Sequence, residues 1–540
     1  MDGLPAIFYQ KYWEVVGTSV TMACLSCLNG GESLEPVNRT LITLIPKTQK
    51  AECMADYRPI SLCNVTYKIV AKTLANKLRG VMCEVISDNQ SAFIPGRLIS
   101  DSTIIGFECL HALKRRKRKN GSMALKLDMS KAYDHMEWSF FISMMEKMGF
   151  SDRWVNRIRD CISSVSFAFN LNGDVCGSVK PSRGLRQGDP LSPYLFPICA
   201  EGLSCILRQA VINNRMAGFQ CIRAGPNISH LFFADDCLLF SKASEKDCRT
   251  IKYVLDAYAK VSGQIINFKK SSLCVSKSIM DLKGRNLADI VGVRLVDCHA
   301  HYLGLPCFTG RKKKHLFEGI KDRIWNKIKG WNAKIFSSGG KEVLVRVFLQ
   351  AIPTYGMSLF RLPKSIIRDL HRMFARFRCG GAEEARKIHW GSWEKLCESK
   401  NLGGLGFRNL DIFSRALLSK QGWRLISTPN SLVARVLKNR YYPAASFLKA
   451  EKCSSRSMVW NSILWGWGIL EAGTRCWIGN GSTVYIKNDR WIPQPATFQI
   501  VSPRVFGNLT TLNTLFLPSG GWNVPLIKAF FLSRMTWKKS

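Results

Sequence analysis

Acidic residues are scarce in this chain. Its 540 residues include 39 Asp and Glu against 78 Lys and Arg, a formal net charge of +39 at pH 7. This excess predicts a polyanionic partner, and nucleic acid is the leading candidate. An anionic membrane surface is the competitor, but the basic residues are spread along the chain and no apolar run approaches the length of a membrane span. We therefore expect no membrane partner.

Several other signals are missing or weak. Cys24 and Cys27 form one C-x-x-C pair without a second pair at zinc-finger distance, which argues against a zinc finger. Most of the 20 cysteines lie in apolar segments, where they are expected to act as small hydrophobic residues. No secretory signal opens the chain, so we expect a reducing intracellular compartment. There is no internal repeat, and the length predicts two to four domains.

An acidic pair is the most informative feature that is present. Asp235 and Asp236 lie between the apolar runs Leu231–Ala234 and Cys237–Phe240. Two short apolar runs around a small turn predict a β-hairpin with the acids at its tip. Adjacent carboxylates repel each other, and a divalent cation would remove that cost. The alternative is a solvated turn, because Asp is a common turn residue.

A third acid, Asp128, ends another apolar run, Met123–Leu127. If this strand pairs with the acidic hairpin, three carboxylates converge. Three carboxylates can hold two divalent metal ions, which is the arrangement that phosphoryl transfer requires. The prediction depends on the two strands being neighbours in one sheet.

Strands and helices alternate along the first 300 residues. Leu41–Pro46 is expected to be a strand, and Ala55–Leu62 a turn that leads into a helix. Apolar spacing and capping residues predict helices at Ile69–Val81, at Tyr133–Met148, after Pro190 and Pro193, and between the capping pair Ser244 and Asp247 and the closing Gly263. Basic helices are expected from about residue 310, followed by a Trp- and Gly-rich tail. This order predicts an α+β fold around an antiparallel sheet.

Five segments, in order, resemble the conserved motifs of reverse transcriptases. They are Leu125–Asp134 (motif A), Gly184–Pro193 (motif B), Phe233–Asp236 (motif C), Gly263–Ser271 (motif D) and Tyr302–Pro306 (primer-grip hairpin). Leu44–Lys47, Tyr57–Ser61 and Gln90–Arg97 resemble the finger region of non-LTR (LINE-type) retrotransposon reverse transcriptases, especially those of plants. The resemblance covers at least residues 1–310, and Gly403–Phe407 extends it into the tail.

This resemblance implies a right-hand polymerase that copies RNA into DNA. Fingers and palm would occupy residues 1–310, a thumb-like basic helical region 311–400, and a mostly helical Trp- and Gly-rich region of unknown role 401–540. Two Mg²⁺ ions, with Mn²⁺ as an alternative, would serve an RNA template, a DNA primer and dNTPs. A nickase or endonuclease would act in trans, and the nucleus is the expected location.

The resemblance also assigns roles to individual residues. Asp128, Asp235 and Asp236 would be the catalytic metal ligands, and Lys270, or its neighbour Lys269, the general acid toward pyrophosphate. The implied substrate-binding residues are Lys47, Arg58, Tyr133, Gln187, Gly188 and Phe233. Tyr133 would be a steric gate against a ribose 2′-hydroxyl; it could also be simply the first apolar residue of its helix, and the two interpretations are compatible. Lys47 and Arg58 would grip the triphosphate; otherwise they are surface charges.

Several alternatives stay open at this point. Nothing in the sequence matches the endonuclease or the Cys/His knuckle of related elements, so we expect a fragment of a longer reading frame. An inactive nucleic-acid-binding remnant, an RNA-dependent RNA polymerase and a group II intron-type maturase are the other candidates; Tyr133 argues against the second and the finger motifs against the third. The basic runs Lys114–Lys119 and Arg311–Lys314 would be nucleic-acid patches or solvated loops. Core packing is expected for most of the tail tryptophans, Trp460, Trp465, Trp467, Trp477 and Trp491.

Overall fold

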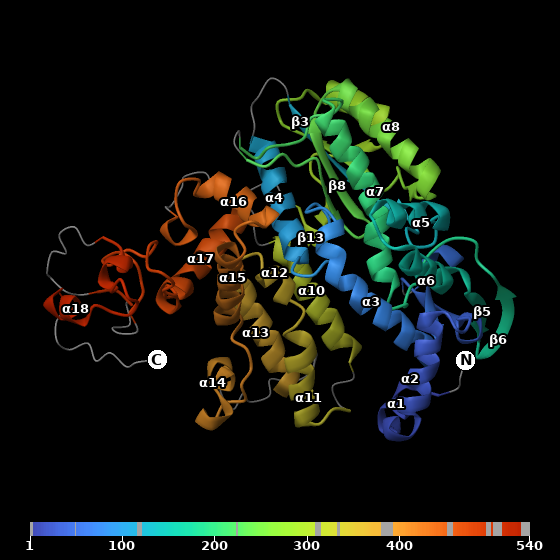
Figure 1. The fold of residues 1–540 in the computed structure, drawn as a ribbon, viewed down its shortest axis with the longest axis horizontal. Helices are drawn as coiled ribbons and strands as arrows, with labels where there is room; N and C mark the ends of the chain where they lie inside the picture. Colours follow the sequence, from blue (N-terminus) through green and yellow to red (C-terminus); the bar gives the residue numbers. More distant parts are fainter. Residues whose placement is uncertain are drawn as a thin grey trace. The chain divides into compact units, whose positions relative to one another are not determined.

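The structure is a computed structural model that divides the chain into two compact units (Figure 1). The first comprises Met1–Lys312 and Pro429–Pro443, and the second Lys313–Thr428 and Ala444–Ser540. The described residues are 4–48, 50–115, 121–222, 225–307, 315–331, 335–379, 392–450, 457–492, 498–500 and 510–530. The α+β class is confirmed, whereas the three-part division of the sequence stays a prediction. The basic runs at 116–119 and 311–314 lie outside the described residues.

A five-stranded sheet carries the acidic segments of the first unit (Figure 1). Its strand order is β11 (Arg294–Leu295), β10 (Ser272–Val275), β3 (Ser122–Leu127), β8 (Asp236–Lys242) and β7 (His230–Phe233). β3 and β8 are antiparallel, with Leu127 opposite Cys237. The strand pairing on which the convergence of the acids depends is therefore confirmed.

Helices cover this sheet and share its core. They are α3 (Val65–Val85), α4 (Ile99–Arg115), α5 (Trp138–Lys147), α6 (Asp152–Ser163), α7 (Ser192–Ile212), α8 (Glu245–Ser262) and α9 (Asp281–Val291). Leu125 and Leu239 of the strands pack in one buried cluster with Phe196 of α7 and Tyr258 of α8. The predicted caps of α8 are confirmed, since Ser244 accepts a hydrogen bond from the Asp247 N–H and the helix closes at Gly263 with φ +73°.

The second sheet of this unit has the order β2 (Tyr57–Cys63), β1 (Arg39–Pro46), β5 (Ser166–Leu171) and β6 (Asp174–Val179). The strand predicted at Leu41–Pro46 is confirmed. The turn predicted at Ala55–Leu62 is wrong, because most of that stretch belongs to β2, which pairs with β1 from Thr40↔Cys63 to Pro46↔Tyr57. Pro59 favoured a turn in the sequence, but β2 lies at the sheet edge, where a residue without an N–H is tolerated.

The helix predicted from Tyr133 begins later, at Trp138. Tyr133 and Met136 precede it, and their carbonyl oxygens accept hydrogen bonds from the Leu185 and Gly184 N–H groups, each at 2.7 Å. A carbonyl that is used by a distant loop is not available to a helix. The structure therefore excludes the interpretation of Tyr133 as the first apolar residue of this helix.

α7 corrects the expectation that no apolar run is long enough to cross a membrane. By length and composition alone, this helix of 21 residues could cross a membrane. However, 67% of the apolar stretch of α7 is buried inside the protein. Leu195, Ile198 and Leu203 belong to the core of the first unit, so the same apolarity serves packing.

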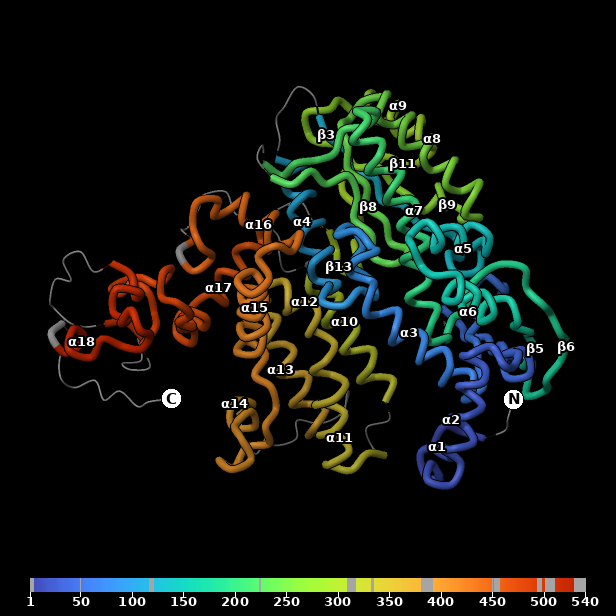
Figure 2. The backbone as a smooth tube through the Cα atoms, in the orientation of Figure 1, coloured from blue at the N-terminus to red at the C-terminus, as the bar shows by residue number. Residues whose placement is uncertain are grey.

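Shorter elements complete the first unit. They are α1 (Ala6–Lys11), α2 (Trp13–Asn29), the pair β4 (Met129–Ser130) and β9 (Ile265–Ile266), the hairpin β12 (His301–Tyr302) and β13 (Leu305–Pro306), and α16 (Leu432–Tyr441). α16 lies beside α4 although it comes far later in the chain (Figure 2). Arg440 of α16 forms a buried ion pair with Glu108 of α4, with 3.0 Å between Nη1 and Oε2.

The described part of the second unit is mostly helical. Its helices are α10 (His315–Gly330), α11 (Ser338–Leu344), η3 (Val345–Leu349), α12 (Thr354–Met357), α13 (Lys364–Cys379), α14 (Trp393–Cys397), α15 (Leu410–Ser427), α17 (Met458–Gly473) and α18 (Val524–Phe530). Trp460 and Trp491 are buried, as expected for core packing, whereas Trp477 is 93% exposed.

Candidate active site

The acidic hairpin forms, but its turn lies one residue earlier than the predicted acidic pair. Phe233 of β7 pairs with Asp236 of β8, so Ala234 and Asp235 make a two-residue turn at the tip. Ala234 adopts φ +54°, in the left-handed region. Asp128 follows the last paired residue of β3, beside the start of β8. The fold thus brings the ends of two antiparallel strands, and their three acids, to one edge of the sheet.

The charges of these acids act on one another. Burial raises the pKa of Asp235, and the charge of Asp128 raises it further. Burial also raises the pKa of Asp236; the neighbouring Lys126 opposes this, while Asp235 and Asp128 add to it. None of the three acids forms an ion pair with another described residue. The edge of the sheet therefore holds negative charge that the described side chains compensate only in part.

This donor set fits a hard divalent cation in its chemistry. Carboxylate oxygens are the ligands that Mg²⁺ and Mn²⁺ prefer, and a cation would offset both the burial and the mutual repulsion that raise the two pKa values. In the described part of the chain, however, no three His, Cys, Asp or Glu side chains are gathered closely enough to form a ready ligand cluster. The three acids are neighbours by register and by electrostatics, and their role as metal ligands stays a prediction.

The loop with the predicted general acid is attached to Asp128. The Asp128 N–H donates to Ser271 Oγ at 3.1 Å, and the Asn267 N–H donates to the Asp128 carbonyl at 2.8 Å. Lys269 and Lys270 lie between these two anchors and are both exposed. The anchors keep both lysines close to the end of β3, and the choice between them stays open.

Tyr133 lies beside the acids. Its ring is half-buried and stacks on Phe196, with 5.0 Å between ring centroids and 9° between planes. Burial, and then the charge of Asp235, raise the pKa of Tyr133 to about 12. The phenol therefore stays neutral, and a ring stacked on Phe196 is suited to a steric role.

The glycine-rich loop at Gly184–Asp189 rests on two other segments. Gly188 has φ +110°, and a Cβ there would lie 2.8 Å from the Ser61 carbonyl oxygen of β2. The Ser61 N–H donates to the Gln187 carbonyl at 2.7 Å, which holds the loop against that strand. Only glycine allows this approach. The structure thus brings the predicted residues Gln187 and Gly188 together on β2.

Two residues of this loop were missed as functional candidates. Arg186 and Asp189 form a buried ion pair, with 2.7 Å between Nη2 and Oδ2 and side chains 4% and 5% exposed. Tyr67 donates to the same carboxylate at 2.8 Å, and Arg186 also donates to Thr40 Oγ1 at 3.1 Å. Opposite charges three residues apart in a glycine-rich loop are a signal that the sequence offered. The pair fixes the chain on both sides of Gln187 and Gly188.

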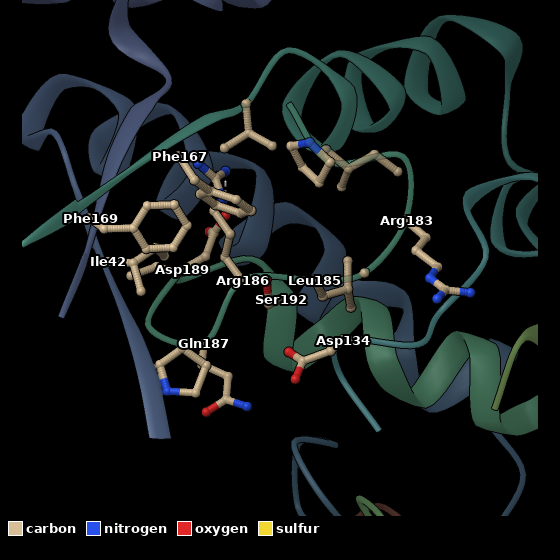
Figure 3. A pocket seen from close by; sticks show the side chains of 16 residues that line it. Ile42, Asp134, Phe167, Phe169, Arg183, Leu185, Arg186, Gln187, Asp189 and Ser192 are labelled. Carbon is tan, nitrogen blue, oxygen red and sulfur yellow. Dashed lines mark hydrogen bonds and ion pairs between the residues drawn. The ribbon is translucent and has the colours of Figure 1, made fainter. Parts of the chain in front are cut away.

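A cavity of about 250 Å³ lies beside this loop (Figure 3). Its walls include Phe167 and Phe169 of β5, and its polar lining includes Asp134, Arg183 and Gln187. Burial raises the pKa of Asp134, while the charges of Lys131, His135 and Lys47 oppose that rise. The cavity is therefore apolar on the side of β5 and polar beside the loop.

Lys47 and Arg58 lie at one end of the β1–β2 ribbon. Arg58 pairs with Ile45, and the Lys47 N–H donates to the Asp56 carbonyl at 2.7 Å, just beyond the end of β1. Both side chains are exposed, and Lys47 Nζ donates to the Ala55 carbonyl at 2.7 Å. The two cations thus share one end of the ribbon, as a phosphate grip requires, although no described contact joins them to the acids.

Comparison with known proteins agrees with this arrangement. The family model "Reverse transcriptase (RNA-dependent DNA polymerase)" matches residues 45–307. The "Transposon TX1 uncharacterized 149 kDa protein" of Xenopus laevis is 29% identical over 50% of this chain and 20% of its own length. The "Uncharacterized mitochondrial protein AtMg00310" of Arabidopsis thaliana is 41% identical over 26% of this chain and 93% of its own length.

A retrotransposon protein is also similar. The "Retrovirus-related Pol polyprotein from type-1 retrotransposable element R2" of Popillia japonica is 26% identical over 44% of this chain and 32% of its own length. The chain therefore spans between about a fifth and a third of the two transposon relatives it matches. The family match, the order of the motifs and the paired acidic strands agree: the chain belongs to the reverse transcriptases of the non-LTR retrotransposon type.

Proposed function

We propose that this chain is an RNA-directed DNA polymerase that adds deoxynucleotides to a primer 3′-end. The observation that carries the proposal is the register of β3 and β8, which brings Asp128 beside the hairpin of Asp235 and Asp236. The raised pKa values of the two hairpin acids support it, because they indicate negative charge that the surroundings compensate only in part. Such sites are where catalytic groups are concentrated.

Each residue near the acids has a task in this proposal. Asp128, Asp235 and Asp236 would hold two Mg²⁺ ions, which when bound would acidify the primer hydroxyl and neutralise the leaving pyrophosphate. Tyr133 would exclude a ribose 2′-hydroxyl, since its ring is fixed against Phe196. The exposed cations would serve the phosphates: Lys47 and Arg58 by binding them, and Lys270 or Lys269 by protonating the leaving group. Gln187, Gly188 and Phe233 would line the nascent base pair.

Primer extension on a homopolymer RNA template tests the proposal. The full chain is expected to incorporate the complementary dNTP in the presence of Mg²⁺, and Asp235→Asn is expected to abolish extension while template binding is retained. Asp256→Asn is the matched control, because Asp256 is exposed on α8 and its one ion pair among the described residues is with Lys252, at 3.2 Å. Extension by the Asp235→Asn variant at the wild-type rate would refute the proposal.

The same assay separates the other candidates. Incorporation of NTPs in place of dNTPs would indicate an RNA polymerase, and template binding without extension by the wild-type chain would indicate an inactive remnant. The partners belong to the proposal as well: an RNA template, a DNA primer, and a nickase or endonuclease in trans. A nuclear location follows from the need for a chromosomal primer, and a fluorescent fusion scored for nuclear enrichment tests it.

A further inference from the structure

The outer edge of β7 is paired by a short segment from far earlier in the chain. β7 is the last strand of its sheet, so one side of it has no strand neighbour. Gln90 forms a parallel bridge with Phe232 there. The Phe232 N–H donates to the Asn89 carbonyl at 2.8 Å, and the Ser91 N–H donates to the Phe232 carbonyl at 3.1 Å. The strand that leads into the acidic turn is therefore held on both sides.

The Gln90 side chain extends this contact to the tip of the hairpin. Its Oε1 accepts hydrogen bonds from the Ala234 N–H at 3.2 Å and from the Ala92 N–H at 2.9 Å. Two backbone donors face this atom, so only the carbonyl end of the amide fits there. Gln90 is 1% exposed, and its Nε2 has no partner among the described residues. Among the described residues, the buried Gln90 amide therefore forms hydrogen bonds through its carbonyl oxygen and none through its NH₂ group.

Ala234 is a residue that needs such support. Its φ is +54°, while Asp235, the other residue of the turn, is not in the positive region. Glycine is usual at a central position of a two-residue hairpin turn where φ is positive. A residue with a Cβ is strained at such a φ, because the Cβ crowds a neighbouring carbonyl oxygen. The conformation therefore has to be stabilised by neighbours, and the Ala234 N–H is bonded to Gln90.

The segment that supplies Gln90 is itself anchored. Arg97 donates to the Gln90 carbonyl at 2.7 Å and to the Ile86 carbonyl at 2.9 Å. Ser102 Oγ of α4 donates to Ser91 Oγ at 2.9 Å. These bonds attach the segment to α3 and α4 independently of the hairpin. Gln90 can therefore hold the turn rather than follow it.

We propose that Gln90 is a positioning residue of the polymerase site. Its side-chain carbonyl keeps Ala234 in the left-handed conformation and so fixes the direction in which Asp235 leaves the hairpin. This role rests on the proposed polymerase function. It assigns to the Gln90–Arg97 segment, which resembles a finger motif, a task in supporting the acids.

Steady-state kinetics of Gln90 variants and a control test whether Gln90 positions the acidic turn. Gln90→Met keeps the length of the side chain without the acceptor, and it is expected to lower kcat about tenfold or more with little change in the KM for dNTP, because it disturbs the acids rather than substrate binding. Ala234→Gly added to Gln90→Met is expected to restore at least half of the wild-type kcat, since glycine adopts the turn unaided. Gln209→Met makes the same substitution at an exposed position of α7, where the amide donates to Asn213 Oδ1 at 3.0 Å; it is the matched control and is expected to keep the wild-type kcat. Gln90→Asn, too short to reach the turn, repeats the test should Gln90→Met fail to fold.

Hydrogen exchange at the Ala234 amide provides an arm that needs no activity. Protection of this amide is expected to fall in Gln90→Met and to persist in the control variant Gln209→Met. Unchanged protection, or failure of Ala234→Gly to restore kcat, would overturn the role of Gln90. A wild-type chain without extension would instead refute the polymerase proposal, and the exchange result would still decide whether Gln90 holds the turn.

Discussion

Arg186 and Asp189 offer the sharpest test of how this site is held. They enclose Gln187 and Gly188 in the sequence, and their side chains are only 4% and 5% exposed. Asp189 receives hydrogen bonds from Arg186 at 2.7 Å, from Tyr67 at 2.8 Å and from the Leu191 N–H at 2.8 Å. Replacing Asp189 with Asn puts an amide donor or a single acceptor where three donors converge, and it leaves the guanidinium buried without its counter-ion.

The size of the effect follows from that burial. Breaking a buried ion pair by removing one partner costs about 3–5 kcal/mol, because the remaining charge stays desolvated. Asp189→Asn and Arg186→Met are each expected to lower the free energy of unfolding by about that amount. The double variant Arg186→Met, Asp189→Leu removes both charges and is expected to recover part of the loss. The rest remains because the Tyr67 hydroxyl and the Leu191 N–H lose their acceptor. An exposed pair gives the contrast: Glu245 and Arg249 are 3.0 Å apart with side chains 60% and 72% exposed, and Glu245→Gln should cost under about 1 kcal/mol.

The assay is urea unfolding monitored by hydrogen exchange at the amides of residues 184–191. It reports the stability of this loop separately from that of the second unit. Primer extension on the same variants shows whether the loop also serves catalysis. Single variants that lose less than about 1 kcal/mol, or a double variant as unstable as either single one, would show that the ion pair does not hold the loop. The positions of Gln187 and Gly188 would then not depend on the Arg186–Asp189 ion pair.

Two further predictions concern the acids and the glycine loop. The pKa of Asp235 is raised in the folded chain, so the native state binds this proton more readily than the unfolded state, and stability is lost as the pH rises through the folded pKa. Without divalent ions, Asp235→Asn should therefore unfold at higher urea than the wild type at pH 7, with the difference vanishing below about pH 3.9; equal midpoints at pH 7 would contradict this. Gly188→Ala should abolish extension, because its Cβ would lie 2.8 Å from the Ser61 carbonyl oxygen at φ +110°, whereas Gly173→Ala, at φ +103° with no atom within 4 Å, should keep it. Similar extension by both alanine variants would show that the close approach is unimportant.

Local signals were enough to predict several elements. The acidic hairpin was predicted because two apolar runs flank a two-residue turn, and both runs became β7 and β8. The ends of α8 were predicted because Ser244 and Gly263 act on backbone groups within one turn of themselves. The pattern and the structure agree wherever the responsible interaction lies within a few residues.

The failures have the opposite cause. Tyr57–Cys63 is a strand because β1 pairs with it, and Tyr133–Met136 is not helical because the loop at Gly184 uses its carbonyls. α7 has the apolarity of a membrane span because it lies inside the first unit. In each case a tertiary neighbour decided between two outcomes that the local sequence allowed.

The residues that orient the site were missed for the same reason. Gln90 lies 144 residues from Ala234, Tyr67 lies 122 from Asp189, and no local pattern connects either pair. Apolar packing brings strands together without fixing the direction of an exposed side chain, because the hydrophobic effect is non-directional. Hydrogen bonds are directional, so the direction of Asp235 and the position of Gln187 have to come from buried polar groups. Buried polar groups are costly unless they are paired. The partners here come from distant parts of the chain: the Ala234 N–H for the Gln90 carbonyl, Thr40 for Arg186 and Tyr67 for Asp189.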